Sequence, residues 1–230
     1  MAFRYTAPPD PEVGETVTRL AQAAAKTATA WALVGGEALR AHGVPRTTVG
    51  VDAVAIDPGI GIVACELAYE MGWTPLNIDP KTRRYAPNNG VALLQLDDDA
   101  VLQGLDEYRR VIVLRSPVGV EVQLLAAQHP VEREIVALAE RTERFGPDVP
   151  IAPLGGVLLV KAMAGRLLDI AALEQTAEHL PFADMVAALK WAEARDPVAG
   201  AALRFFMARA RARKVPSRQY PVPRPRGPKK

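Results

Sequence analysis

The hydrophobic pattern is clearest near residue 31, where an apolar run, Trp31 to Val34, is followed at once by the pair Gly35-Gly36. The run has the length of a buried strand, and glycine gives the backbone the freedom for a tight turn into a helix. This helix is predicted to be short and to end at Gly43. A second strand is predicted over residues 49–56, where one polar side chain, Asp52, interrupts an apolar sequence. The pattern therefore indicates a strand–glycine turn–helix–strand unit.

Helical spacing of apolar residues predicts a helix before this unit and another after it. The first follows Asp10-Pro11, a typical N-cap followed by proline at the first helical position. The second runs from Ile60 to Met71 and stops at Gly72. Further strands are predicted at residues 73–78, 91–96, 111–114 and 118–125, with a helix opened by the acids at 97–99.

From residue 130 onward the apolar period is helical, and the sheet is predicted to be complete by residue 125. The expected fold class is α+β, with a mixed sheet flanked by helices and a helical C-terminal half. The expected divisions are an α/β core at 1–128, a helical region at 129–213 and a basic, proline-rich tail at 214–230. The predicted helices after the sheet are 130–143, 154–165, 168–180, 182–195 and 198–213.

Charge is distributed unevenly along the chain, although its net value is only +2. Residues 197–230 hold ten Lys/Arg and no acid, so any RNA or acidic protein partner is expected to bind the basic region 204–230. No apolar run is long enough for a membrane helix, and the N-terminus lacks a signal-peptide pattern. A cytoplasmic protein with no membrane contact is expected. The single cysteine, Cys65, excludes an internal disulfide.

The residues after the short helix carry a motif: Arg46, Thr48, Gly50 and Asp52 stand at alternate positions. Together with Gly35-Gly36 they resemble the opening of a nucleotidyltransferase domain of the DNA polymerase β type, closest to the bacterial AbiEii-like branch. That branch has the pattern R-x-T-x-D-x-D, whose two acids bind metal ions. The resemblance implies a nucleotidyltransferase fold and makes Asp52 a metal ligand and catalytic residue. On its chemistry alone, Asp52 could instead be a strand acid paired with Arg46.

Two of the three carboxylates that the resemblance implies are replaced. Gly50 stands at the first position, and Gln123, in Val120 to Leu125, stands at the third. Glu121 lies two residues before Gln123 and so on the same strand face, where it is either a replacement ligand or an exposed acid on an edge strand. The metal site is therefore predicted to be degenerate, with weak Mg²⁺ binding.

Nucleotide contacts are implied at Gly35, Gly36, Arg46, Thr48, Lys161 and Arg166. In the resembled family the last two lie on a helix that faces the nucleotide, in a pattern completed here by Asp169. The alternative for that helix is a surface ion pair between Arg166 and Asp169. Glu37 follows the glycine pair, and its charge disfavours a phosphate at the same place.

Three functions stay open from the sequence. The first is a degenerate nucleotidyltransferase, a pseudoenzyme that binds a nucleotide, a nucleic acid or a protein. The second is an active enzyme that transfers a nucleoside monophosphate from a nucleoside triphosphate with Asp52 and Glu121, as in a toxin paired with an antitoxin. The third is a dinucleotide-binding module at Gly59, Gly61 and Ala64, with Asp79 about 20 residues further on.

Overall fold

The computed structural model describes the chain at 9–45, 48, 50–56, 59–76, 78–79, 84–85, 94–95, 111–141, 144–146, 148–165 and 167–214. Arg46, Val49 and Arg166 lie outside the described residues, as do the predicted helix that the acids at 97–99 open and the tail from 215 to 230. The predictions made for those residues therefore stay predictions.

A mixed, seven-stranded sheet forms the centre of the described structure, which has the expected α+β class. Its neighbours pair in parallel at β8–β2 and β1–β10 and antiparallel elsewhere. The strands, in spatial order, are β3 (Thr74–Pro75), β7 (Val111–Arg115), β8 (Glu121–Ala126), β2 (Gly50–Ala55), β1 (Trp31–Val34), β10 (Pro150–Ile151) and β9 (Glu140–Arg141).

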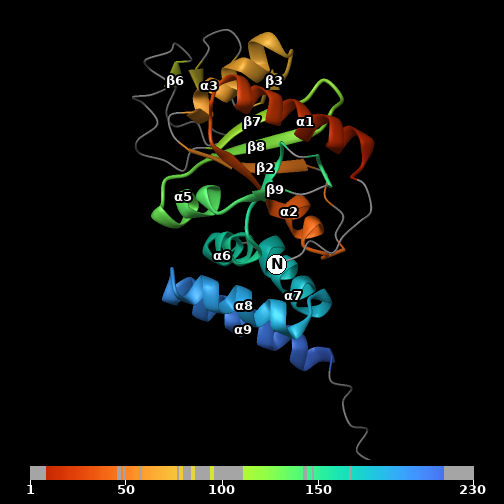
Figure 1. The fold of residues 1–230 in the computed structure, drawn as a ribbon, viewed down its shortest axis with the longest axis vertical. Coiled ribbons are helices and arrows are strands. Elements are labelled where there is room, and N and C mark those ends of the chain that lie inside the picture. Colours follow the sequence, from red (N-terminus) through yellow and green to blue (C-terminus); the bar gives the residue numbers. More distant parts are fainter. Residues whose placement is uncertain are drawn as a thin grey trace, which may run out of the picture.

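The two faces of the sheet are covered differently. Helices α1 (Pro11–Lys26) and α3 (Gly59–Cys65), with the π-helical turn η1 (Glu66–Glu70), lie on one face, and α2 (Gly35–Ala41), α5 (Pro130–Ala137) and α6 (Leu154–Ala164) lie on the other (Figure 1). Strand β8 alternates between buried and half-buried residues, with Val122 and Leu124 fully buried and Glu121, Gln123 and Leu125 less covered. The half-buried face is the one toward α5 and α6, and it leaves room for a pocket.

The predicted strand–glycine turn–helix–strand unit is confirmed. Strand β1 is buried at all four residues, and Gly35 takes a φ of +66°, a conformation that residues with a Cβ rarely adopt. Helix α2 follows directly, and a second glycine with positive φ, Gly43, comes after its end. Strand β2 then returns antiparallel to β1, so that Val34 faces Asp52. The N-cap at Asp10 is also confirmed, since its carboxylate accepts the Glu12 N–H at 3.0 Å.

The prediction that the sheet is complete by residue 125 is wrong. Strand β9 lies within the predicted helix 130–143, which ends as α5 at Ala137, and β10 lies in a predicted loop. Ile151 pairs in parallel with Leu33, and β9 pairs with β10 to form the sheet edge. Residues beyond the predicted division at 128 thus contribute to the sheet, and the division itself stays a prediction.

Four helices after β10 confirm the predicted helical C-terminal half. The first of the four is α6. The other three pack on one another and on α6, mainly on the side of α6 away from the sheet (Figure 1). After α6 they are α7 (Leu167–His179), α8 (Phe182–Glu193) and α9 (Pro197–Lys214). Helix α2 also contacts α6, which joins the helical half to the glycine unit. None of the helices among the described residues is long and apolar enough to cross a membrane.

The dinucleotide-binding alternative is not supported by the topology. The predicted strand at 73–78 is shorter than expected, and as β3 it is separated from β2 by two other strands. Asp79 belongs to β4 (Ile78–Asp79) of a separate antiparallel sheet with β5 (Arg84–Tyr85) and β6 (Leu94–Gln95). A Cβ on Gly59 would lie 2.4 Å from Cγ2 of Thr29, so a side chain already fills the space that a pyrophosphate would need.

Candidate functional site

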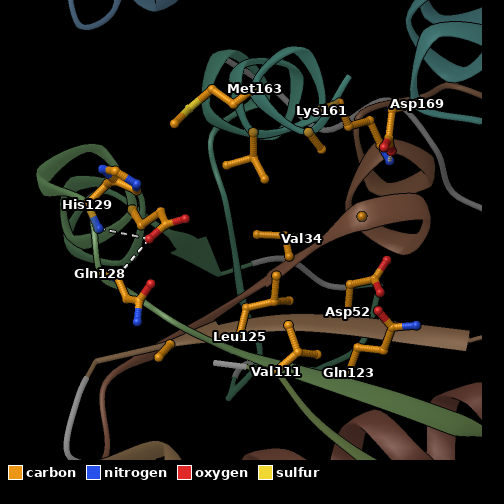
Figure 2. Close-up of a pocket in the computed structure, with 15 residues that line it drawn as sticks. Val34, Asp52, Val111, Gln123, Leu125, Gln128, His129, Lys161, Met163 and Asp169 are labelled. Atoms are coloured by element: carbon orange, nitrogen blue, oxygen red, sulfur yellow. Dashed lines mark hydrogen bonds and ion pairs between the residues drawn. The ribbon is translucent and has the colours of Figure 1, made fainter. Parts of the chain in front are cut away.

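A pocket of about 340 Å³ lies between the half-buried face of the sheet and helices α5, α6 and α7. Its floor comes from β1, β2, β7 and β8, and its opposite wall comes from α6 and the start of α7. Figure 2 shows polar side chains at two ends, with Asp52, Gln123, Lys161 and Asp169 at one and Gln128 and His129 at the other. Between the ends the lining is apolar and includes Val34, Val111 and Leu125.

Strand register brings the predicted metal-site positions together. Asp52 pairs in parallel with Gln123, and Gly50 pairs with Glu121, so all four residues share one face of the sheet. The Gln123 amide donates to Oε1 of Glu121 at 3.4 Å. Strand β8 lies between β2 and β7, so the alternative that Glu121 is on an edge strand is wrong. Glu121 is half-buried, beside Gly50 and opposite Arg115 of β7.

Among the residues that the structure describes, no group of three or more His, Cys, Asp or Glu side chains is placed to hold a metal ion. At the three positions where the resemblance implies carboxylates, only Asp52 has one. Oxygen ligands other than Asp52 on this face are the Gln123 amide and the Glu121 carboxylate. This donor set offers far less than the two-metal sites of nucleotide transfer, where several carboxylates share the ions.

Asp52 packs directly against the start of α2. A Cβ built on Gly35 would lie 1.9 Å from Oδ2 of Asp52 and 2.7 Å from its Cβ and Cγ. The next glycine is covered in the same way, because a Cβ on Gly36 would lie 2.9 Å from Cβ and Oγ1 of Thr48. The Thr48 hydroxyl donates to the Gly50 carbonyl at 3.0 Å, which fixes it there. Both glycines are therefore needed for this close approach of side chains to the helix.

Lys161 and Asp169 form a buried ion pair that the sequence did not reveal. Nζ of Lys161 lies 3.1 Å from Oδ1 of Asp169, and the two side chains are 11% and 4% exposed. The predicted surface pair between Arg166 and Asp169 is wrong in its placement of Asp169, which is buried. Gly165, in the left-handed conformation at φ +62°, ends α6 between the two partners and turns the chain so that they meet.

Glu37 does not face the pocket as a free acid, because two arginines take its carboxylate. Nη1 of Arg40 lies 2.9 Å from Oε1, and Nη2 of Arg144 lies 3.3 Å from Oε2. The Glu37 side chain is fully buried, and that of Arg144 is 2% exposed. This network joins the first turn of α2 to the segment between β9 and β10. Sequence reasoning missed Arg144, since 107 residues separate it from Glu37.

No protein-family model matches the chain, and no curated protein matches it. Among solved structures, it is similar to an antigenic nucleotidyltransferase-like protein from Paracoccidioides brasiliensis, at 18% identity and a TM-score of 0.43, over 86% of this chain and 95% of that one. It is also similar to ANT(2")-Ia in complex with adenylyl-2"-tobramycin, at 10% identity and a TM-score of 0.43, over 87% and 97% of the two chains.

Proposed function

We propose that the protein is nucleotidyltransferase-like with a degenerate metal site, and that its pocket binds a nucleoside or nucleotide without efficient metal-dependent transfer. The observation that carries this proposal is the shared sheet face of Gly50, Asp52 and Gln123, of which Asp52 and Gln123 lie at the floor of the pocket. These are the three positions at which the resemblance to the AbiEii-like branch implies carboxylates. One charge remains there, and it lies against the protein's own helix α2.

The physical basis for degeneracy is the ligand count. Two-metal transfer needs carboxylates to hold ions that activate the attacking oxygen and neutralise the triphosphate. Mg²⁺ also demands near-octahedral oxygen coordination and gives up its water reluctantly. A carboxylate and an amide on neighbouring strands support at most weak Mg²⁺ binding. The ligand is therefore held mainly by the pocket's apolar middle and its amide groups.

The test is titration calorimetry with ATP, with and without Mg²⁺, on the full chain. Weak binding that changes little when Mg²⁺ is added is the expected result. A matched variant, Asp52→Asn, removes the remaining charge without changing the shape of the side chain. If neither nucleosides nor nucleotides bind, the proposed ligand class is wrong.

Active transfer with Asp52 and Glu121 is the second candidate. Glu121 is half-buried on the same face as Asp52, and its amide neighbour Gln123 donates to its carboxylate at 3.4 Å. Tight ATP binding that requires Mg²⁺ and is lost in Glu121→Gln would favour this candidate over the degenerate site. The variant Glu134→Gln, which removes an acid of α5 that pairs with Arg195, is the matched control.

The basic region 204–230 is proposed to bind RNA or an acidic protein, with the larger share falling to its last residues. In α9, Arg204 and Arg209 are paired with Glu193 and Glu174, which reduces the charge they offer to a partner. Deletion of 214–230 should weaken RNA binding and flatten its dependence on salt. Unchanged affinity and salt slope would make the tail a solubilising extension. A toxin role with an antitoxin stays a prediction from the resemblance.

A further inference from the structure

In the part of the pocket that the structure describes, three groups that attract phosphate already have an acidic partner from the chain itself. The first is Lys161, the cation of the pocket lining, which pairs with Asp169 at 3.1 Å. Both side chains are nearly buried, so the pair is screened little by solvent. A phosphate would have to displace a buried carboxylate that the fold holds at the first turn of α7.

The second group that attracts phosphate is the start of α5. Glu132 lies in its first turn and bends back to accept the backbone N–H groups of Gln128 at 2.7 Å and His129 at 2.9 Å, both on Oε2. Backbone N–H groups at a helix N-terminus are a common phosphate site when they are open. Here they bind a carboxylate, and Glu132 itself lines the pocket.

The third group that attracts phosphate is the start of α2. The Asp52 carboxylate lies so close to Gly35 that a Cβ there would be 1.9 Å from Oδ2. The place where the resemblance implies a triphosphate is thus filled by the protein's own anion. Among the described residues of the lining, three acids, Asp52, Glu132 and Asp169, stand against one lysine, Lys161. Such a lining repels a phosphorylated ligand in the absence of metal.

The remaining lining is apolar with amide groups, which suits an uncharged molecule that forms hydrogen bonds. The middle of the pocket is formed by Val34, Val111, Leu125, Val160 and Met163. Gln123 and Gln128 add amide groups, which both donate and accept hydrogen bonds, at the two ends. A volume of about 340 Å³ is near the lower end of the range of ~300–1,000 Å³ for small-ligand sites.

We propose that the pocket takes a nucleoside, a base with its ribose, and discriminates against phosphate. This inference rests on the proposed function, since it narrows the ligand class of the same pocket. Affinity should fall with each phosphate added, in the order adenosine, AMP, ATP, and the same order should hold in the guanosine and cytidine series. The step from nucleoside to triphosphate should weaken binding about tenfold or more.

Calorimetry with the three members of each series, without metal, tests the inference directly. Tighter binding of nucleosides supports it. Tighter binding of ATP than of adenosine overturns it and leaves the proposed ligand class standing. Binding of no member in any series overturns both, so the two failures are distinguishable.

Two variants test the cause of the discrimination. Asp169→Asn releases Lys161, and Glu132→Gln removes the charge at the start of α5; each should tighten AMP binding relative to adenosine by about fivefold to tenfold. Asp148→Asn, whose acid is 80% exposed, is the control and should leave the ratio unchanged. Thermal melts establish that each variant is folded, and if Asp169→Asn does not fold, Glu132→Gln decides. An unchanged ratio in a folded variant would overturn the inference.

Discussion

Replacement of Gly35 by alanine tests the contact on which the interpretation of the pocket depends. Two costs arise at this residue. The backbone φ of +66° is unfavourable for any residue with a Cβ. The new methyl group would also lie 1.9 Å from Oδ2 of Asp52 and 2.7 Å from its Cβ and Cγ, so the whole Asp52 side chain must move.

The magnitude follows from the two costs together. The left-handed conformation costs alanine about 1–2 kcal/mol. Loss of the carboxylate from its place at the start of α2 adds about 1 kcal/mol, since a charge favourably placed at a helix end contributes roughly that amount. The free energy of unfolding should therefore fall by about 2–3 kcal/mol, which lowers the melting temperature of a domain of this size by about 4–12 °C.

Gly72→Ala is the matched control, because Gly72 has a similar φ of +71° but no heavy atom within 4 Å of a built Cβ. It should show the conformational cost alone, about 1–2 kcal/mol. Urea unfolding followed by circular dichroism measures both variants. The double variant Gly35→Ala with Asp52→Ala should lose the contacts with Oδ2 and Cγ, keep only the 2.7 Å approach to Cβ, and cost less than the two single changes combined. Equal costs for Gly35→Ala and Gly72→Ala would refute the contact between Asp52 and α2.

Three other predictions concern stability. Glu37→Gln should cost about 3–5 kcal/mol in urea unfolding, because it removes a fully buried carboxylate that pairs with Arg40 and with the buried Arg144, whereas the half-exposed Glu15→Gln should cost under about 1 kcal/mol. The double variant Gly50→Asp with Gln123→Asp should have a lower melting temperature than the wild type in the absence of metal, because its carboxylates repel one another. Addition of Mg²⁺ or Mn²⁺ should restore the melting temperature. A melting temperature of the variant that does not change with metal would contradict this prediction. Burial lowers the pKa of His42 in the folded state, so as the pH falls the unfolded state binds the proton before the folded state does. The free energy of unfolding should therefore decrease as the pH falls below the ordinary pKa of 6.5. The variant His42→Gln should lose less stability than the wild type between about pH 7 and 5.5.

Local sequence signals were enough to predict the centre of the fold. The unit from β1 through α2 to β2 follows from a four-residue apolar run, two glycines and a second apolar run, all adjacent in the chain. Helices α6 to α9 follow from the apolar period, with ends within a few residues of those predicted. Alternation along β8 also predicted that Glu121 and Gln123 share a face, and pairing with β2 brings Gly50 and Asp52 to the same face.

Strands β9 and β10 could not be predicted from their own residues. Each has two residues, too few to show an alternating pattern. Ile151 becomes a strand residue because Leu33, 118 positions earlier, offers its backbone at the free side of β1. Such pairing is a property of the assembled sheet, and no local preference marks it.

Partners of the buried charges were hidden for the same reason. The spacing rule for helices considers pairs three or four residues apart, such as Arg166 and Asp169. Lys161 stands eight residues before Asp169 on the preceding helix, and Gly165, which ends that helix, turns the chain so that the two meet. In the same way, the acid of Glu37 was visible in the sequence, and its burial under Arg144 was not.

The replaced acids and the internally paired charges are parts of one physical arrangement. A site with three carboxylates needs metal ions to offset their repulsion, whereas a single carboxylate at the same place can be stabilised by a helix N-terminus. With Gly50 and Gln123 at the other two positions, Asp52 lies against the start of α2, where Gly35 leaves the necessary space. The proposed function implies that this contact fills the place that a phosphate would take. We therefore expect weak metal binding and discrimination against phosphate to occur together, so a variant that regains metal binding should regain phosphate binding as well.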